Sequence, residues 1–267
     1  GGSFLKKFEE SVTEYTGAAY AVGISSGTTA LHIALLLAGV QPNDLVITTN
    51  LSFVATANAI KYTGADPIFL DIDSETWLLD LKLLAEFLET DCYIKGQSCF
   101  HKATKRRISA IVPVHILGNM PDMNELCALA ELYHLALVED AAESLGSFYK
   151  GQHSGTFGVA GTLSFNSNKI ITTAGGGMLL ANNDQTAKRA KHLITQAKNS
   201  TLEYLHDEVG YNYRLVNPLA AIGLAQMEQL PRFVEKKKEI TELYTQQLAI
   251  LPEIRFQRIT PDVNSNY

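Results

Sequence analysis

The order of apolar and helical segments predicts an α/β domain with a largely parallel sheet that helices cover on both faces. Short, continuously apolar segments alternate with segments of helical periodicity along most of the chain, and polar turns separate them. Continuous apolar strands are typical of strands buried on both faces, and their alternation with helices is typical of parallel strands joined by crossovers. The 267 residues suffice for one large core with room for a second, small domain.

An amphipathic helix is expected over residues 3–16, because apolar side chains recur there every three or four residues and Gly17 follows. Strands are expected at 19–24, 45–48, 68–72, 108–114, 135–138, 159–165 and 178–181. Further helices are expected at 30–38, 53–62, 80–89, 123–134 and, with a break at Pro231, 218–250. The polar loops after the strands then lie at the sheet edge where open α/β sheets bind their ligands.

Residues 91–107 interrupt this alternation with a polar, basic segment. It contains Lys95, Lys102, Lys105, Arg106 and Arg107. A cluster of this kind can meet phosphate groups, but a solvated loop is the better explanation, because charged surface loops are common. The whole chain carries a formal net charge of −6, so nonspecific binding of nucleic acid, which requires a basic face, is not expected.

The cysteines indicate a reduced, cytoplasmic protein. Cys92, Cys99 and Cys127 are odd in number and form no C-x-x-C pair. Cys92 and Cys99 together with His101 lack a fourth ligand and a recognised zinc spacing, so no metal site is expected. No run of 18 apolar residues occurs, and no membrane-spanning helix is expected.

The first loop with chemical potential is Ser26-Gly27-Thr28, which precedes a strongly apolar helix. Free amides, the helix dipole and two hydroxyl groups meet at such a position, which suits a phosphate group. An ordinary helix N-cap explains the same residues equally well.

The second loop follows an apolar strand with two adjacent carboxylates, Glu139 and Asp140, and then small residues. Asp140 is expected near the sheet edge in a poorly hydrated place, where a carboxylate needs a partner. A protonated ring nitrogen of a ligand would serve, and so would an arginine in a purely structural pair.

The third loop carries Lys169 on a polar turn between two apolar segments. Ser164 lies near the end of the preceding strand, and three glycines, 175–177, precede the next one. Glycines allow a planar group to approach the backbone, and a lysine amine can bind a carbonyl group covalently. Taken alone, the stretch more often indicates a solvated lysine.

Together the three loops provide what pyridoxal phosphate requires. Its phosphate needs amides and hydroxyls, its pyridinium needs a carboxylate, and its aldehyde needs an amine. Phe53, at the start of the helix after the second strand, is placed to stack on the ring, although core packing explains it equally well. A dinucleotide or Walker-type nucleotide site is less well supported, because neither G-x-G-x-x-G nor a Walker A motif is present.

Six motifs then occur in one order, and their combination is highly specific. They are Ser26–Leu31, Ser52–Ile60, Glu139–Ala142, Ser164–Lys169, the glycine-rich strand to Met178, and Gly210–Arg214. Over nearly the whole chain the sequence resembles the DegT-type sugar-nucleotide aminotransferases, a branch of the aspartate-aminotransferase-like, pyridoxal-phosphate-dependent transferases. The resemblance implies a large cofactor-binding domain over residues 1–235. It also implies a connecting helix and the start of a largely missing C-terminal small domain over 236–267.

The resemblance also implies roles for individual residues. Lys169 would hold pyridoxal 5'-phosphate as a Schiff base and act as the catalytic acid and base, and Asp140 would bind the pyridine nitrogen. The other cofactor contacts implied are Ser26, Gly27, Thr28 and Ser164 at the phosphate, Phe53 on the ring, Glu143 near the phenolic oxygen, and Asn212 at the phosphate of the neighbouring subunit of a homodimer. His115 and Asn166 are candidates for substrate contact.

Two positions depart from the usual family pattern. After Thr173 the family usually has Gly-Glu-Gly-Gly, whereas this chain has Ala174 and three glycines, and Asn166 replaces a common histidine. Both variants are similar to the subgroup that acts on UDP-linked 4-keto-6-deoxy-N-acetyl sugars for cell-surface glycans or nonulosonic acids. The family also has a segment before Gly1 and a domain after Tyr267, so the sequence is expected to be a fragment.

The expected reaction is transfer of an amino group from L-glutamate to a UDP-linked keto sugar. Transfer to another keto sugar or to a cyclitol is an alternative. Dehydratase relatives replace the lysine with histidine, whereas Lys169 is present here. A non-catalytic regulatory or scaffold protein with the same fold is the alternative from another class.

Overall fold

The computed structural model describes residues 2–199 and 203–267 and contains a mixed, mainly parallel sheet. Seven of its strands follow one another in the order β1 (Tyr20–Ile24), β11 (Gly177–Ala181), β10 (Ala160–Ser164), β7 (Ala136–Asp140), β6 (Arg107–Val112), β2 (Leu45–Thr49) and β3 (Asp66–Leu70). Strand β11 pairs antiparallel with both β1 and β10, while the pairs from β10 to β3 are parallel. The predicted fold class is confirmed.

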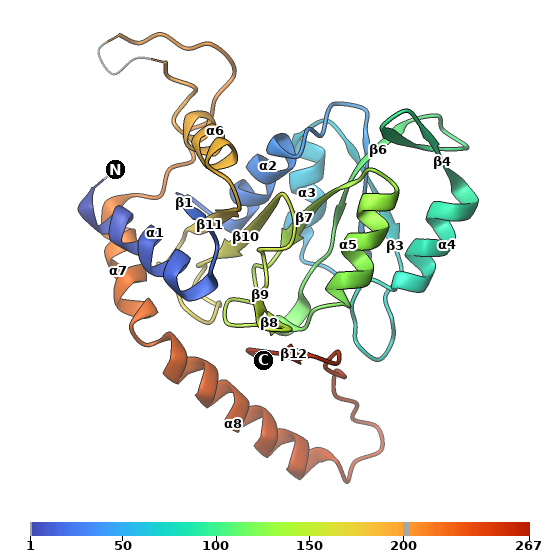
Figure 1. Ribbon diagram of the computed structural model, residues 1–267. Coiled ribbons are helices and arrows are strands. Elements are labelled where there is room, and N and C mark those ends of the chain that lie inside the picture. The colour runs from blue at the N-terminus through green and yellow to red at the C-terminus, as the bar shows by residue number, and fades with distance from the viewer. Residues whose placement is uncertain (1, 200–202) are drawn as a thin grey trace.

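Helices cover both faces of this sheet (Figure 1). One face packs against α2 (Gly27–Leu37), α3 (Val54–Tyr62) and α6 (Asp184–Ile194). The other face packs against α4 (Leu81–Asp91) and α5 (Met123–Leu132) at one end, and against α1 (Ser3–Thr16), α7 (Asn217–Met227) and α8 (Leu230–Leu248) at the other. Strand β11 shows why both layers form. Met178 and Leu180 pack on the α1 and α7 side, whereas Leu179 packs on the α2 side, because successive side chains of a strand point to opposite faces.

The basic segment 91–107 is not the solvated loop expected from its composition. It forms a hairpin, β4 (Cys92–Lys95) and β5 (Ser98–His101), and β5 continues the sheet beside β6. Arg106 Nη2 lies 2.6 Å from Asp66 Oδ2, and Arg107 Nε lies 3.0 Å from an Asp44 carboxylate oxygen. These arginines therefore pair with residues at the start of β2 and β3, while the hairpin itself joins the sheet through the pairing of β5 with β6.

Helix α6 is the element that the sequence reading missed. Asn183 caps it by accepting the Thr186 N–H at 2.8 Å, and Ala187, Ala190 and Leu193 form its buried stripe. Its buried residues are Ala187, Ala190, Leu193 and Ile194, and they recur every three or four positions between charged residues. The signal that could have revealed it is the cap followed by this spacing.

The C-terminal part contains the break expected at Pro231, which occupies the first turn of α8. Helix α8 continues past the proposed division at residues 235 and 236, so whether the chain divides into domains there stays a prediction. The chain then returns to the main body, where β12 (Val263–Asn264) pairs with β8 (Phe148–Tyr149), which pairs in turn with β9 (Gln152–His153). Within the described residues no helix is long and apolar enough to cross a membrane.

Candidate functional site

The loops at the carboxyl ends of the central strands surround a cavity of about 680 Å³. This volume is in the range of small-molecule and cofactor sites. The predicted residues that line it are Ser26, Gly27, Thr28, Phe53, Asp140, Glu143, Ser164, Asn166 and Lys169. The tertiary structure thus brings the three loops identified in the sequence into one site.

The N-terminus of α2 forms one wall of the cavity. Ser26 Oγ accepts the Thr29 N–H at 3.1 Å, and Thr29 Oγ1 accepts the Ser26 N–H at 3.0 Å, so Ser26 is a helix cap. The start of a helix also leaves its first amides available to an anion. A Cβ on Gly27 would lie 2.9 Å from Ser164 Cβ, so only glycine permits this close approach to the end of β10. Ser26 can therefore cap α2 while the first N–H groups of the helix stay available to an anion.

Lys169 lies in the cavity beside a carboxylate. Its Nζ is 3.1 Å from Glu143 Oε1, and the lysine side chain is 15% exposed. Glu143 Oε2 accepts the Leu117 N–H at 3.0 Å. Lys169 is therefore mostly buried and oriented by a partner, in contrast to the solvated lysine that the sequence alone favoured.

Asp140 ends β7 and is almost fully buried. Its carboxylate accepts Thr56 Oγ1–H at 2.7 Å and the Ala142 N–H at 3.3 Å. Burial nevertheless raises the pKa of Asp140, and among the described residues no arginine pairs with it. A cationic ring nitrogen in the cavity would favour the ionised carboxylate, so the site matches a pyridinium better than a structural arginine.

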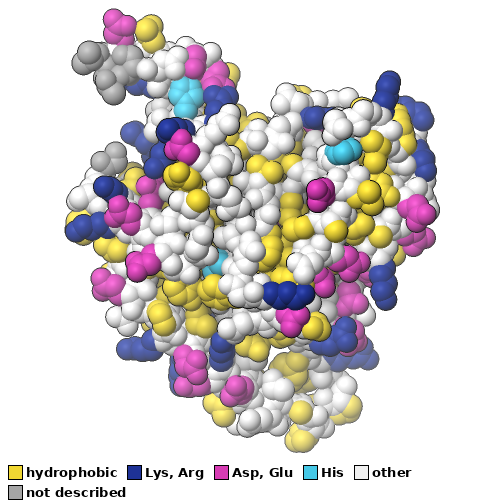
Figure 2. Space-filling model, viewed as in Figure 1, with side chains coloured by type: hydrophobic (Ala, Val, Ile, Leu, Met, Phe, Trp, Pro, Cys, Tyr) yellow, Lys and Arg dark blue, Asp and Glu magenta, His cyan; other side chains and the backbone are white. Residues whose placement is uncertain are grey.

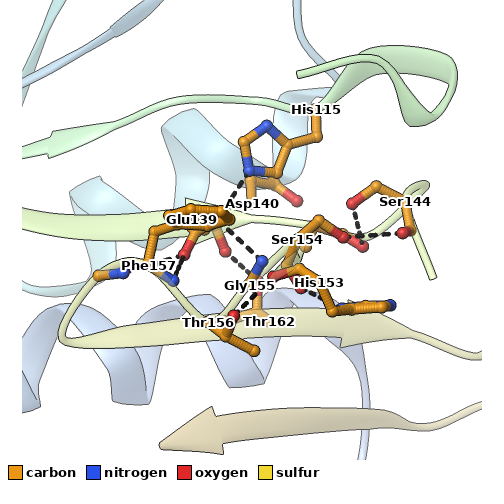
Figure 3. A network of polar contacts seen from close by, with 12 residues as sticks. His115, Glu139, Asp140, Ser144, His153, Ser154, Gly155, Thr156, Phe157 and Thr162 are labelled. Atoms are coloured by element: carbon orange, nitrogen blue, oxygen red, sulfur yellow. Dashed lines mark hydrogen bonds and ion pairs between the residues drawn. The ribbon is translucent and has the colours of Figure 1, made fainter. Parts of the chain in front are cut away.

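Glu139, the neighbouring carboxylate, faces away from the cavity and is fully buried. Its oxygens accept the N–H groups of Gly155, Phe157 and Gly158 at 2.7–3.0 Å. Figure 3 shows Glu139 in this network together with Gly155 and Phe157. Alternation along a strand predicts that the two carboxylates point to opposite faces, but the sequence does not show which of them faces the cavity.

The structure contradicts the expected substrate contact of His115. The side chain is fully buried, and its Nε2 donates to Glu139 Oε2 at 2.9 Å. Its Nδ1 has no hydrogen-bond partner in the part of the chain that the structure describes. The ring lies close to Asp140 in Figure 3, so His115 belongs to the buried support of the site.

Phe53 and Asn212 occupy different places. The Phe53 side chain is 76% exposed and lines the cavity, so core packing does not explain it. Asn212 lies outside this cavity, in a strand-like bridge with Thr195, and lines a second cavity of about 860 Å³ together with Arg214 and several lysines. A contact of Asn212 with a neighbouring subunit stays a prediction.

Three lining or supporting residues were missed by the sequence reading. Thr56 supports Asp140, and Trp77 and Leu117 line the cavity on the side of the C-terminal segment. Thr56 lies within a motif of the resemblance, which was the available signal. No sequence signal separates Trp77 or Leu117 from ordinary core residues, because neither lies in one of the motifs.

Outside the cavity, charged side chains of both signs are interspersed over the face shown in Figure 2. Among the described residues, one group has the geometry of metal ligands, namely His192, Asp207 and Glu208. Glu208 is already ion-paired with Arg189 and His192 with Asp207. All three cysteines are free, and Cys92 lies opposite His101 across the hairpin.

Comparison with known proteins adds the family. A model of the DegT/DnrJ/EryC1/StrS aminotransferase family matches residues 1–267. EpsN of Bacillus subtilis, whose name assigns it to the pyridoxal phosphate-dependent aminotransferases, is 41% identical over 255 residues, which is 96% of this chain and 63% of EpsN. GDP-perosamine synthase of Escherichia coli O157:H7 is 40% identical over 253 residues, which is 95% of this chain and 65% of that protein. The chain therefore spans less than two thirds of the length of these relatives.

Solved structures show the same fold. DesV of S. venezuelae, in complex with a ketimine intermediate, matches with a TM-score of 0.89 and 29% identity. The match covers 100% of this chain and 67% of DesV. A DegT DnrJ EryC1 StrS aminotransferase from Brucella abortus matches with a TM-score of 0.91 and 26% identity, over 100% of this chain and 68% of that chain.

Proposed function

Because the chain belongs to the DegT/DnrJ/EryC1/StrS aminotransferase family, we propose that it is the cofactor-binding part of a pyridoxal-phosphate-dependent sugar aminotransferase. The observation that carries the proposal is the meeting of Lys169, Asp140 and the N-terminus of α2 in one cavity. The three groups match the aldehyde, the ring nitrogen and the phosphate of that cofactor. The name of EpsN and the DesV complex support the same activity class.

The residues present fit the cofactor on structural grounds. Gly27 leaves space that a Cβ would close against Ser164, and a Cβ on Gly177 would lie 2.6 Å from the Ser26 carbonyl carbon. Burial raises the pKa of Asp140, so a cationic ring nitrogen beside this carboxylate would favour its ionised form. The phosphate would therefore lie at Ser26, Gly27, Thr28 and Ser164, the ring under Phe53, and its nitrogen at Asp140.

Bound pyridoxal phosphate supplies an aldehyde that takes up amino groups and a ring that accepts the electrons left when a carbon–hydrogen bond breaks. Lys169 Nζ would hold the aldehyde group of the cofactor and would move a proton during transfer of the amino group. Asp140 would favour the protonated form of the ring nitrogen. Glu143 holds the Lys169 amine in place through the 3.1 Å contact.

The amino donor is L-glutamate and the acceptor is a nucleotide-linked keto sugar, with UDP-4-keto-6-deoxy-N-acetylhexosamine as the acceptor we test first. The product would serve cell-surface glycan or nonulosonic acid synthesis. The relatives include GDP-perosamine synthases as well as a UDP-4-amino-4,6-dideoxy-N-acetyl-beta-L-altrosamine transaminase from Campylobacter jejuni. A GDP-linked sugar is therefore the comparison substrate. We place the protein in the cytoplasm, because free thiols persist in a reducing compartment.

We also propose a homodimer with shared active sites. Asn212 lies outside the Lys169 cavity, and in a dimer it would approach the phosphate in the other subunit. The exposed apolar side chain of Val54, at the start of α3, suits a covered surface. Sedimentation of the full-length protein as a monomer at working concentration would contradict this proposal.

The test is the visible absorbance of the full-length protein with pyridoxal phosphate, before and after L-glutamate. We expect a band that bleaches with glutamate and returns on addition of the keto sugar. Lys169→Ala should reduce turnover by at least about a thousandfold, whereas Lys82→Ala, at an exposed lysine outside both cavities, should leave it unchanged. A protein that keeps turnover without Lys169 would contradict the mechanism. One that does not take up pyridoxal phosphate would favour the regulatory alternative, a role named for a relative from Geobacillus stearothermophilus that is 35% identical.

A further inference from the structure

Trp77 lies on the loop between β3 and α4, at the boundary of two cavities. It lines the cavity that contains Lys169 and also the groove between α8 and the C-terminal segment. Its backbone φ is +60°, in the left-handed region that bulky side chains rarely adopt. In the part of the chain that the structure describes, Trp77 belongs to none of the three apolar core clusters. The strain therefore does not serve core packing.

Several hydrogen bonds hold this strained turn. The Trp77 N–H donates to the Asp73 carbonyl at 2.8 Å, and the Asp73 carboxylate accepts the N–H and the hydroxyl of Thr76 at 2.8 and 2.9 Å. The Arg258 N–H donates to the Glu75 carbonyl at 2.8 Å. Figure 1 shows this loop beside the C-terminal segment. A strained conformation that its surroundings fix in this way is typical of a binding site.

Leu117 forms a second strained position on the same wall. Its φ is +52°, and its side chain is 48% exposed although it is apolar. Gln257 Nε2 joins the two turns, because it donates to the Thr76 carbonyl at 2.8 Å and to the Ile116 carbonyl at 3.3 Å. The Leu117 N–H is bound by Glu143, the partner of Lys169. The wall is thus positioned relative to the catalytic lysine.

We propose that Trp77 and Leu117 form an apolar wall that binds the carbon–hydrogen face of the hexose ring of the keto sugar. The inference rests on the proposed function and identifies residues with which that site recognises its sugar acceptor. The sugar's carbonyl carbon must reach Lys169, so its ring occupies the space between the lysine and the cavity mouth. An aromatic and an aliphatic side chain suit one apolar ring face, while polar groups such as Asn166 and Asn168 on the lining meet the hydroxyls. Glutamate has no such ring and does not need the wall.

Trp77 is the only tryptophan within these 267 residues, and the difference in fluorescence between the wild-type and the Trp77→Phe protein reports this wall. We titrate the full-length protein with the UDP-linked sugar, the GDP-linked sugar and the nucleoside diphosphates alone. Quenching by a sugar nucleotide, and at least about tenfold less by its nucleoside diphosphate, supports the hexose contact. Equal quenching by the nucleoside diphosphate overturns it.

The matched variants separate the two half-reactions. Trp77→Ala should raise KM for the sugar about tenfold or more and leave the rate of bleaching by glutamate within about twofold, whereas Trp77→Phe keeps most of the sugar affinity. Trp77→Gly, for which a positive φ costs little, provides a folded variant if the alanine variant is unstable. Phe69→Ala, at an exposed aromatic residue outside the cavity, is the control and should change neither constant.

An unchanged sugar KM in both the alanine and glycine variants, or an equal loss in both half-reactions, would overturn the assignment. Failure of the proposed function is distinguishable. In that case glutamate bleaches nothing in the wild-type protein, whatever the sugar does to the Trp77 fluorescence.

Discussion

Glu139 and Asp140, the last two residues of strand β7, differ in how many hydrogen bonds their carboxylates accept. On the side of the strand away from the cavity, the Glu139 carboxylate accepts hydrogen bonds from three backbone N–H groups and from His115. On the cavity side, the Asp140 carboxylate accepts hydrogen bonds from one hydroxyl group and one backbone N–H, and burial raises its pKa. Two adjacent, buried acidic residues therefore have different roles. The carboxylate with all its acceptors occupied stabilises the fold, and the incompletely paired one is available to a ligand.

The largest effect on stability is expected at Glu139. In Glu139→Gln an amide group replaces one oxygen and meets N–H donors that then have no acceptor, all in the interior. We expect a loss of about 3–5 kcal/mol in the free energy of unfolding, measured by urea denaturation of the cofactor-free protein. Glu143→Gln is the matched control, because that side chain is 37% exposed, and should cost no more than about 1 kcal/mol. Equal losses at the two positions would refute the comparison.

His153, in the polar network of Figure 3 that contains Glu139, is expected to make the protein less stable in acid. Burial lowers its pKa to about 4, below the ordinary value of about 6.5. Between these values the unfolded chain binds a proton that the folded chain does not, so stability falls as the pH falls from about 6.5 to 4. The full loss is about 3 kcal/mol.

The variant His153→Gln removes this titration, and its free energy of unfolding should change less over that pH range than the wild type's. His32, whose pKa burial also lowers, contributes to both proteins and cancels in the difference. Parallel pH profiles for the two proteins would show that His153 is not the source.

The smallest effect on stability is expected at Asp140. Its folded pKa lies above the unfolded value, so ionisation of this group weakens the folded state as the pH rises. Asp140→Asn should therefore be as stable as the wild type, or more stable, at pH 7 without cofactor. Turnover of the full-length enzyme should nevertheless fall by at least about a hundredfold. A stable variant with an unchanged rate would remove Asp140 from the mechanism, and an unstable one would make it a structural carboxylate like Glu139.

The alternation of apolar and helical segments was enough to predict the fold class. The three polar loops predicted part of the cavity lining, whereas Trp77 and Leu117 were not predicted. The positions of Ser26, Asp140 and Lys169 followed because the carboxyl ends of parallel strands meet at one edge. The prediction failed for the hairpin at 91–107 and for α6. The hairpin joins the sheet through the pairing of β5 with β6 and through Cys92 and Cys99, which lie in the apolar core, and the basic composition of the segment does not indicate these two buried positions.

The sequence by itself determined which residues are candidates for the chemistry, because their types and their order along the chain match the motifs of the family. Only the tertiary structure decided which way they face. It turned Glu139 and His115 into the interior, left Asp140 at the cavity, and brought Trp77 and Leu117 from two separate turns onto one wall. The physical reason is that burial and partner choice are set by contacts between distant segments, here including the C-terminal Gln257, which joins the two turns of that wall.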